Sequence, residues 1–305
     1  MHYLDVTPGG TYMDVTFGGG GHAAAILDRL SGDGRLIAMD RDPEAVSRGA
    51  ALLQKYPNLS LEKEAFSNIA GVAARQGISG HVDGILADLG TSMFQLRDPS
   101  RGFSFMDEGP LDMRMDPDLE RTAADIVNRY SESDLADLFR EYGEERHARR
   151  IAREIVDRRK RQPFETTLQF ARMVESLAGG RRERIHPATR CFQALRIEVN
   201  RELDELSDFL AAAWELLKVG GRLVVISFHS LEDRAVKRFL KEKSRDCICD
   251  EQAMRCTCGG DNASARILTR HVVRPDEGEV QENRASRSSR LRAAEKIRAV
   301  DACGQ

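Results

Sequence analysis

The stretch TYMDVTFGGGGHAAAILDRL, Thr11 to Leu30, decides the fold of this chain. Thr11 to Phe17 alternates β-branched, aromatic and polar residues, which predicts a strand. Four glycines follow, and the helical pattern His22 to Leu30 begins directly after them. This order of strand, glycine-rich turn and helix lets the backbone approach a ligand beside the free amides that open the helix.

The chain after this stretch continues to alternate between strand and helix patterns. Pro43 stands at the first-turn position of a predicted helix. The predicted strand Val82 to Leu89 is mostly apolar, as a buried parallel strand must be. Alternation of this kind predicts a doubly wound, Rossmann-like α/β sheet. The expected strands are Arg35 to Asp40, Leu59 to Ala65 and Val82 to Leu89, and the expected helices are Pro43 to Lys55 and Ser67 to Gln76.

The alternation stops after Gly90, and roughly 100 residues follow with helical periodicity and no convincing strand. Within them, Glu144 to Arg161 reads as an amphipathic helix with a basic outer face. Strand character returns at Arg222 to Phe228, after a turn at residues 218–221. We therefore expect a discontinuous α/β domain, residues 1–100 and 190–305, interrupted by an all-helical domain, residues 101–189. A helix is expected at Leu231 to Lys243, and a last strand or short helix at Arg290 to Ile297.

Composition places the chain among soluble globular proteins. Of its 305 residues, 41% are hydrophobic and 31% are charged, enough for a core beneath a heavily charged surface. No apolar stretch approaches the roughly 18 to 20 residues that a membrane span requires. No basic region followed by an apolar run opens the chain, so we expect a cytoplasmic protein.

Charge is unevenly distributed along the chain. The net charge is −3, but residues 140–190 contain 14 Lys and Arg against 8 Asp and Glu, or +6, which leaves −9 for the rest. The C-terminal half of the predicted helical domain is therefore the segment best suited to a polyanionic partner.

Acidic residues near the glycines indicate what the turn could bind. Gly18, Gly20 and Ala23 fit the dinucleotide pattern G-x-G-x-x-G/A, which alone is a weak signal, because a plain flexible turn is the alternative. Asp40 ends the second strand about 20 residues later, where an acid accepts hydrogen bonds from ribose hydroxyls. Nicotinamide dehydrogenases and S-adenosylmethionine enzymes share this geometry. Asp14 favours the second class, because a carboxylate there suits a methionine ammonium group and would repel a pyrophosphate.

Two further strands end in polar clusters at the same predicted edge of the sheet. Asp88 is followed by Leu89, Gly90, Thr91 and Ser92, and the later strand ends in Ser-Phe-His-Ser-Leu-Glu-Asp, with the histidine at His229. An acid at this edge could orient an amine nucleophile. His229 alone is more often a helix-capping or core histidine, but its place beside a second acidic strand end also permits a functional role.

Several long strings resemble one family. They are DVTFGGGGH (Asp14 to His22), AMDRDP (Ala38 to Pro43), DLG (Asp88 to Gly90), RGFSFMDEGPLDMRMDP (Arg101 to Pro117), YGEER (Tyr142 to Arg146), HPATRCFQALRIEVNREL (His186 to Leu203) and SFHSLEDR (Ser227 to Arg234). In these strings, and in their order along nearly the whole chain, the sequence is similar to the bacterial 16S ribosomal RNA cytosine-N4 methyltransferases.

The resemblance implies a class I S-adenosylmethionine-dependent methyltransferase with a helical insertion for RNA recognition. Its substrate would be 16S rRNA in the small ribosomal subunit, and its target the exocyclic amine of a cytidine in the decoding centre, by resemblance cytidine 1402. The implied catalytic group is Asp88, assisted by Ser92 or His229. The implied cofactor contacts are Gly20, Gly21 and His22 in the first turn, Asp40 at the ribose, Phe66 beside the adenine, and Asp88 and Gln95 completing the pocket.

The sequence departs from the family pattern in three places. The usual N-terminal His-x-Pro-Val-Leu segment is not found before Tyr3, so we expect an N-terminal element to be missing. Val15 and Gly19 stand where Gly and often Arg are usual, and residues 91–96 replace a more usual Val-Ser-Ser-Pro-Gln-Leu. Two rival functions follow: a methyltransferase of this fold with another substrate, and an RNA-binding assembly factor with a vestigial pocket.

Four of the six cysteines are clustered, as Cys247-x-Cys249 and Cys256-x-Cys258. Four thiolates within twelve residues could bind zinc tetrahedrally, although C-x-x-C is the more typical spacing. The alternative is a set of free thiols in a surface hairpin. A zinc ion here would be accessory to the methyl transfer.

Overall fold

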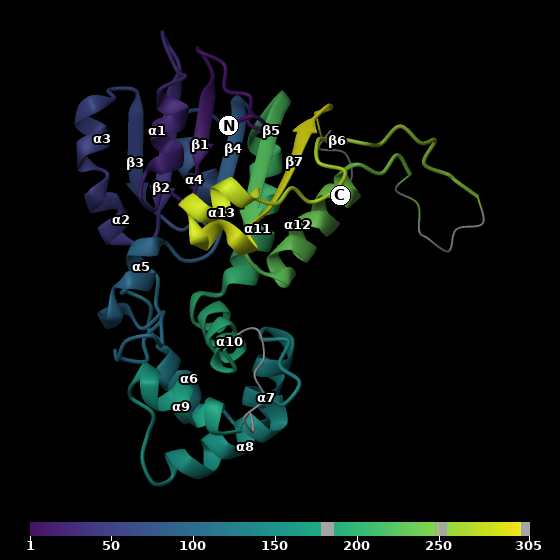
Figure 1. Cartoon of the computed structure of the whole chain (residues 1–305). Helices are drawn as coiled ribbons and strands as arrows, with labels where there is room; N and C mark the ends of the chain where they lie inside the picture. Colours follow the sequence, from purple (N-terminus) through teal and green to yellow (C-terminus); the bar gives the residue numbers. More distant parts are fainter. Residues whose placement is uncertain (178–185, 248, 250–254, 300–305) are drawn as a thin grey trace. The chain divides into compact units, whose positions relative to one another are not determined.

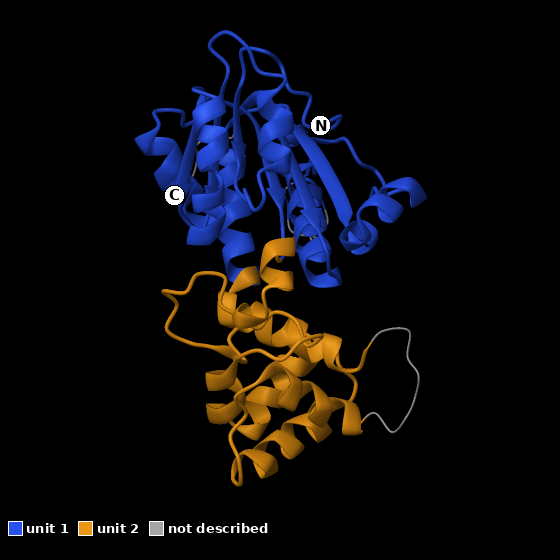
Figure 2. Cartoon of the chain, turned by 60° about the vertical axis from the view of Figure 1, so that its left-hand side comes forward, with its two compact units in different colours: residues 1–90, 203–305 blue, residues 91–202 orange. Residues whose placement is uncertain are grey.

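The computed structural model describes residues 1–177, 186–247, 249 and 255–299. The chain divides into two compact units: residues 1–90 with 203–305, and residues 91–202 (Figure 2). The helical unit begins directly after Gly90, so it starts earlier and ends later than the expected range 101–189. Cys303 lies outside the described residues.

One mixed sheet organises the first unit, which confirms the predicted doubly wound α/β fold. In the described residues it has seven strands in the order β3-β2-β1-β4-β5-β7-β6. The first five are parallel, and β7 runs antiparallel to both β5 and β6. The strands are β1 Thr11–Asp14, β2 Arg35–Asp40, β3 Leu59–Lys63, β4 Val82–Asp88, β5 Leu217–Ser227, β6 Ala265–Ile267 and β7 Arg290–Lys296.

Helices cover both faces of this sheet, because alternate residues of each central strand point to opposite sides (Figure 1). Met13 and Ile85 belong to one buried cluster, together with residues of α4, α11 and α12. Tyr12 and Leu86 belong to the other, together with residues of α1. These helices are α1 Gly21–Leu27, α4 Ile69–Arg75, α11 Glu202–Leu216 and α12 Ser230–Lys243.

Two local expectations are wrong. The helix expected over Pro43 to Lys55 is two helices, α2 Pro43–Arg48 and α3 Ala50–Lys55, separated at Gly49, where a Cβ would collide with Leu61. The turn expected at residues 218–221 lies inside β5, whose register against β4 shifts between Val82 and Gly84. The shorter elements of this unit are η1 Phe66–Asn68, α13 Glu277–Glu282 and η3 Arg284–Ser288.

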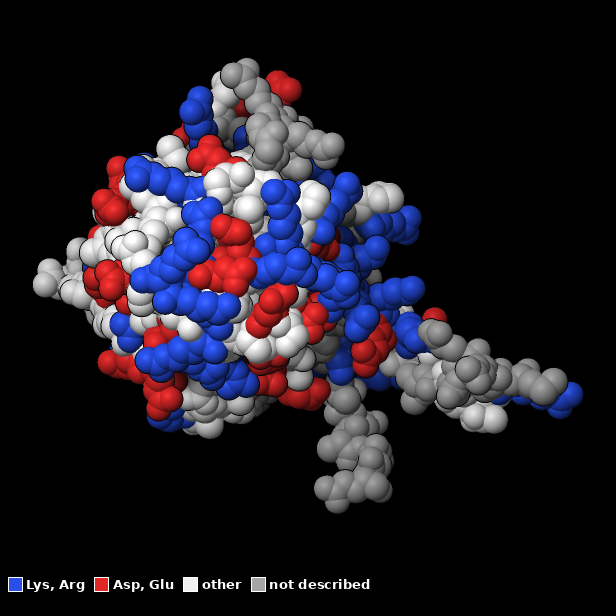
Figure 3. Space-filling model, turned by 90° about the horizontal axis from the view of Figure 1, so that it is seen from below, with Lys and Arg blue, Asp and Glu red and all other residues white. Residues whose placement is uncertain are grey.

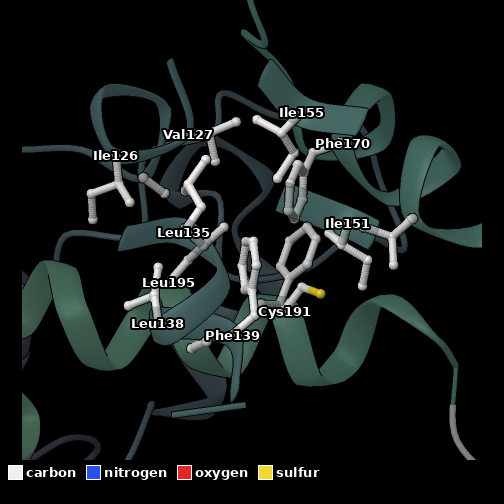
Figure 4. Packing of buried hydrophobic residues seen from close by; sticks show 14 of the residues in the cluster. Ile126, Val127, Leu135, Leu138, Phe139, Ile151, Ile155, Phe170, Cys191 and Leu195 are labelled. Carbon is white, nitrogen blue, oxygen red and sulfur yellow. The ribbon is translucent and has the colours of Figure 1, made fainter. Parts of the chain in front are cut away.

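The second unit is helical and has its own core. Phe139, Phe170 and Leu195 are fully buried in it, surrounded by aliphatic side chains (Figure 4). The helix expected from Glu144 begins at Ala148, because Glu144 adopts a φ of 49° that an α-helix cannot contain. The helices are α5 Met93–Arg97, η2 Pro99–Arg101, α6 Ala123–Arg129, α7 Glu132–Glu141, α8 Ala148–Arg159, α9 Thr167–Leu177 and α10 Ala188–Asn200.

Within the described ranges, no helix combines the length and the apolar composition that crossing a membrane requires.

Candidate active site

Three aspartates end three adjacent parallel strands. Asp14 is the last residue of β1, Asp40 of β2 and Asp88 of β4. Asp14 pairs in register with Ala38 of β2 and Leu86 of β4, so the three carboxyl ends lie at one edge of the sheet. Doubly wound proteins bind their ligands at this edge.

Asp14 is fully buried and only partly satisfied. Its Oδ1 accepts the main-chain N–H of Thr16 at 3.2 Å, whereas its Oδ2 has no hydrogen-bond partner among the described residues. Burial raises the pKa of Asp14 to about 6, against the opposing effects of His22 and the Thr16 N–H, and nearby Asp88 and Asp40 raise it further. A buried, unpartnered carboxylate oxygen is costly, and a cationic ligand group would satisfy it.

Asp88 is anchored through its main-chain N–H, and one of its carboxylate oxygens accepts no hydrogen bond from the described residues. Its main-chain N–H donates to the Thr16 hydroxyl at 2.6 Å, and its Oδ2 lies 3.5 Å from His22 Nε2. The hydrogen bond to Asp88 raises the pKa of His22, although burial opposes this. The buried Oδ1 of Asp88 accepts no hydrogen bond from the part of the chain that the structure describes.

Asp40 organises the glycine turn. Its Oδ2 accepts the Gly18 N–H at 2.7 Å and its Oδ1 accepts the Asp42 N–H at 2.9 Å. Burial raises the pKa of Asp40, against the lowering effect of these two bonds. Each carboxylate oxygen has a second lone pair, so Asp40 can still accept hydrogen bonds from a ribose.

Gly20 and Gly21 have different surroundings. Gly20 has a φ of 77°, and a Cβ there would lie 2.8 Å from Phe17 Cζ. A Cβ on Gly21 would meet no atom within 4 Å. The turn is thus tightly packed beneath Gly20 and open beside Gly21, which leaves space for a ligand.

Phe66 begins η1 and is separated from the end of β3 by two residues. Its ring packs edge-on against Phe209 with the centroids 5.5 Å apart, and the side chain is half-buried. Phe66 is therefore part of the core at a strand-to-helix junction. The exposed part of its side chain could contact a ligand.

His229 follows the end of β5 and is 7% exposed. It is the N-cap of α12: its Nδ1 accepts the Glu232 N–H at 3.4 Å, and Glu232 accepts the His229 N–H at 3.3 Å. His229 Nε2 lies 3.1 Å from Glu232 Oε1. The structure thus gives His229 the helix-capping role that sequence reasoning had kept as an alternative.

Ser92 and Gln95 belong to the helical unit. Ser92 is the N-cap of α5, where its Oγ accepts the Gln95 N–H at 3.2 Å and Gln95 Oε1 accepts the Ser92 N–H at 3.0 Å. The expected catalytic assistant Ser92 and the expected pocket residue Gln95 therefore have a local structural role as a capping box.

Thr16 is the site residue that sequence reasoning missed. It connects Asp14 to Asp88 through the two hydrogen bonds described above. The available signal was a hydroxyl residue within the loop between the first strand and the glycines, but nothing in the sequence identified its partner.

The four clustered cysteines lie between α12 and β6. Their Sγ atoms all lie within 4.8 Å of one another. The cluster includes none of the three strand-end aspartates, so it is a separate feature of the first unit.

A basic helix face is present in the second unit. Helix α8 buries Ile151 and Ile155 and exposes Arg149, Arg150 and Arg153. Arg153 Nε lies 3.6 Å from Glu132 Oε1. The molecular face in Figure 3 carries many Lys and Arg side chains, with Asp and Glu interspersed among them.

Comparison with known proteins identifies the family. Residues 1–297 match the model of the MraW methylase family. The "Ribosomal RNA small subunit methyltransferase H" of Thermomicrobium roseum is 53% identical over 97% of this chain and 91% of the relative. The protein of the same name from Syntrophobacter fumaroxidans is 52% identical over 97% and 93%. A solved structure of a putative rRNA methylase from Clostridium thermocellum covers 97% of this chain and 90% of its own, with 15% identity and a TM-score of 0.42. The chain belongs to the MraW methylase family.

Proposed function

We propose that this protein transfers a methyl group from S-adenosylmethionine to the exocyclic amine of a cytidine in small-subunit ribosomal RNA. The observation that carries the proposal is the pair of buried carboxylate oxygens on Asp14 and Asp88, at neighbouring strand ends, that have no hydrogen-bond partner among the described residues. The Asp14 oxygen suits a cationic group, and the Asp88 oxygen suits an N–H donor. The names of relatives with more than half of their residues identical support ribosomal RNA as the substrate.

The residues at the sheet edge fit S-adenosylmethionine better than a dinucleotide. Asp14 Oδ2 would accept the methionine ammonium group, whereas a pyrophosphate would meet a buried negative charge. Asp40 would accept the ribose hydroxyls, and the open space beside Gly21 leaves room for the ligand. When bound, S-adenosylmethionine supplies a methyl group already activated by its sulfonium charge.

Asp88 is the group that would act on the cytosine. The lone pair of cytosine N4 is delocalised into the ring, so the amine is a poor nucleophile. Hydrogen bonding from N4–H to Asp88 Oδ1 would localise that lone pair and hold the amine in line with the methyl group. N4 would lose one proton as it gains the methyl group, and the Asp88 carboxylate would accept that proton and stabilise the charge that develops on N4. Ser92 or His229 would assist Asp88 in localising this lone pair.

The helical unit would hold the RNA. Exposed arginines such as Arg149 and Arg150 contribute sequence-independent affinity for phosphates, while the pocket selects the base. The target cytidine must leave its stack, because a paired amine has no free line of attack. The direct transfer requires no metal ion, so zinc at the four cysteines would have a structural role.

Two measurements test the proposal. Calorimetry should detect binding of S-adenosylmethionine or S-adenosylhomocysteine, and NAD binding of equal affinity would refute the cofactor. Mass spectrometry of small-subunit RNA nucleosides, with and without the protein, should show N4-methylcytidine only when the protein is present. Cofactor binding with no RNA methylation would favour a methyltransferase with another substrate. Absence of cofactor binding would favour an assembly factor.

A further inference from the structure

The segment between α12 and β6 contains four cysteines in two C-x-C pairs, none of them in a disulfide. Cys247 and Cys249 form the first pair, and Cys256 and Cys258 the second. All four are exposed or half-buried. Burial of apolar surface therefore cannot account for their gathering, and another interaction must favour it.

The sulfur positions have the dimensions of a metal tetrahedron. The Sγ–Sγ distances are 3.5 Å for Cys256–Cys258, 3.7 Å for Cys247–Cys256 and Cys247–Cys258, and 4.0 Å for Cys249–Cys256. Zn–S bonds of about 2.3 Å in a tetrahedron give a sulfur–sulfur edge of about 3.8 Å. A disulfide needs about 2.05 Å. We propose that these four thiolates bind one structural zinc ion.

Hydrogen bonds around the cluster favour sulfur in its thiolate form. The main-chain N–H groups of Thr257 and Cys258 donate to Cys249 Sγ at 3.2 and 3.3 Å. Donors of this kind stabilise a negative sulfur and fix the direction of its lone pairs. Zinc binding would release the four thiol protons and leave a net charge of −2, beside which the sequence places Arg245 and Arg255.

The base of the segment is anchored to the first unit. The Ser264 N–H donates to the Lys243 carbonyl at 2.8 Å, and the Asn262 N–H donates to the Asp246 carbonyl at 3.1 Å. Trp214 Nε1 donates to Ser264 Oγ at 3.2 Å. Hydrogen bonds thus close the loop at its base, and zinc would fasten it at the cysteines. The ion stabilises this connection and takes no part in the reaction at the strand-end aspartates.

Metal analysis of the full chain tests the site. We expect about one zinc ion per chain after purification under reducing, chelator-free conditions. The double variant Cys247→Ser with Cys256→Ser should lose this zinc, whereas the matched variant Cys303→Ser should retain it. Cobalt in place of zinc should show the visible absorption of a tetrahedral thiolate complex. Protein without stoichiometric metal, stoichiometric iron in place of zinc, or full zinc retention by the double variant would overturn the proposal.

A second experiment does not depend on the folding of a variant. Trypsin can cut after Arg245 and Arg255, which flank the first C-x-C pair. Cleavage there should become markedly faster when a strong chelator removes zinc from the unmodified protein, and should slow again when zinc is restored. An unchanged cleavage rate would refute the structural role. Binding of S-adenosylmethionine should survive chelation, so failure of the zinc site is distinguishable from failure of the proposed function.

Discussion

The main-chain N–H of Asp88 donates to the Thr16 hydroxyl at 2.6 Å, which ties the end of β4 to the loop after β1. This bond uses the backbone of Asp88 and not its carboxylate. A substitution of the Asp88 side chain therefore leaves the strand end anchored and removes only what the carboxylate contributes, which includes its contact with His22.

Asp88→Ala should lower kcat by on the order of 100-fold, because it removes one preorganised partner of the reacting amine. Asp40→Ala should instead raise the KM for S-adenosylmethionine by roughly 10-fold or more, through lost hydrogen bonds to the ribose. Steady-state kinetics at saturating RNA separates the two effects. Full turnover by Asp88→Ala at saturating cofactor would exclude its proposed role.

Asp14→Asn should stabilise the free protein and weaken cofactor binding. Burial raises the Asp14 pKa from 3.8 to about 6. The folded state therefore holds this proton more tightly than the unfolded state, and stability falls as pH rises between these two values. The charged form costs on the order of 3 kcal/mol above pH 6, which asparagine avoids.

Denaturation of both proteins at pH 4 and pH 8 checks this sign. The variant should gain stability over the parent at pH 8 and gain little at pH 4. Calorimetry should show that the same variant binds S-adenosylmethionine more weakly. A loss of stability at pH 8 would mean that Asp14 is satisfied within the protein.

Gly20→Ala and Gly21→Ala form a matched pair. At Gly20 the left-handed φ of 77° and the nearby Phe17 ring make alanine destabilising, by roughly 1–2 kcal/mol for the backbone alone. At Gly21 a methyl group meets only open space, so the fold should be unaffected while the cofactor loses room. Thermal denaturation and calorimetry should therefore show reduced stability in the first variant, and reduced S-adenosylmethionine affinity without instability in the second.

His229 can be tested with two substitutions that separate capping from catalysis. His229→Ala removes the N-cap of α12 and should cost about 1 kcal/mol. His229→Asn retains a strong N-cap residue and should restore most of that stability. If kcat remains low in His229→Asn, the imidazole assists the reaction. If kcat is normal, His229 is a capping residue only.

The alternation of strands and helices made the parallel part of the sheet predictable. Arg35 to Asp40 was delimited correctly because both of its ends are marked, by the turn at Gly34 and by the acid Asp40. The break at Gly49 is local, since Gly49 keeps helical dihedral angles, and the close packing of Leu61, which leaves no room for a Cβ there, could not be predicted from the sequence.

The strand-end aspartates could be predicted because strand direction alone brings them to one edge. The sequence could not show which hydrogen-bond partner each polar atom has. Ser92, Gln95 and His229 use their side chains in helix caps, and Thr16 bridges two strands. Such roles depend on atomic geometry that the spacing of residues does not specify.

The basic face of α8 yields a test of RNA recognition. Arg149 and Arg150 are exposed, whereas Arg153 lies near Glu132. We expect the double variant Arg149→Gln with Arg150→Gln to flatten the logarithmic salt dependence of RNA binding by roughly 0.7 to 0.9 for each lost phosphate contact. Arg153→Gln is the control and should change the slope less, because Glu132 already offsets part of its charge. S-adenosylmethionine binding should be equal in all three proteins. An unchanged slope in the double variant would mean that this helix face is solvated and does not bind RNA. RNA recognition would then be sought at the arginines of residues 284–298, a second concentration of positive charge.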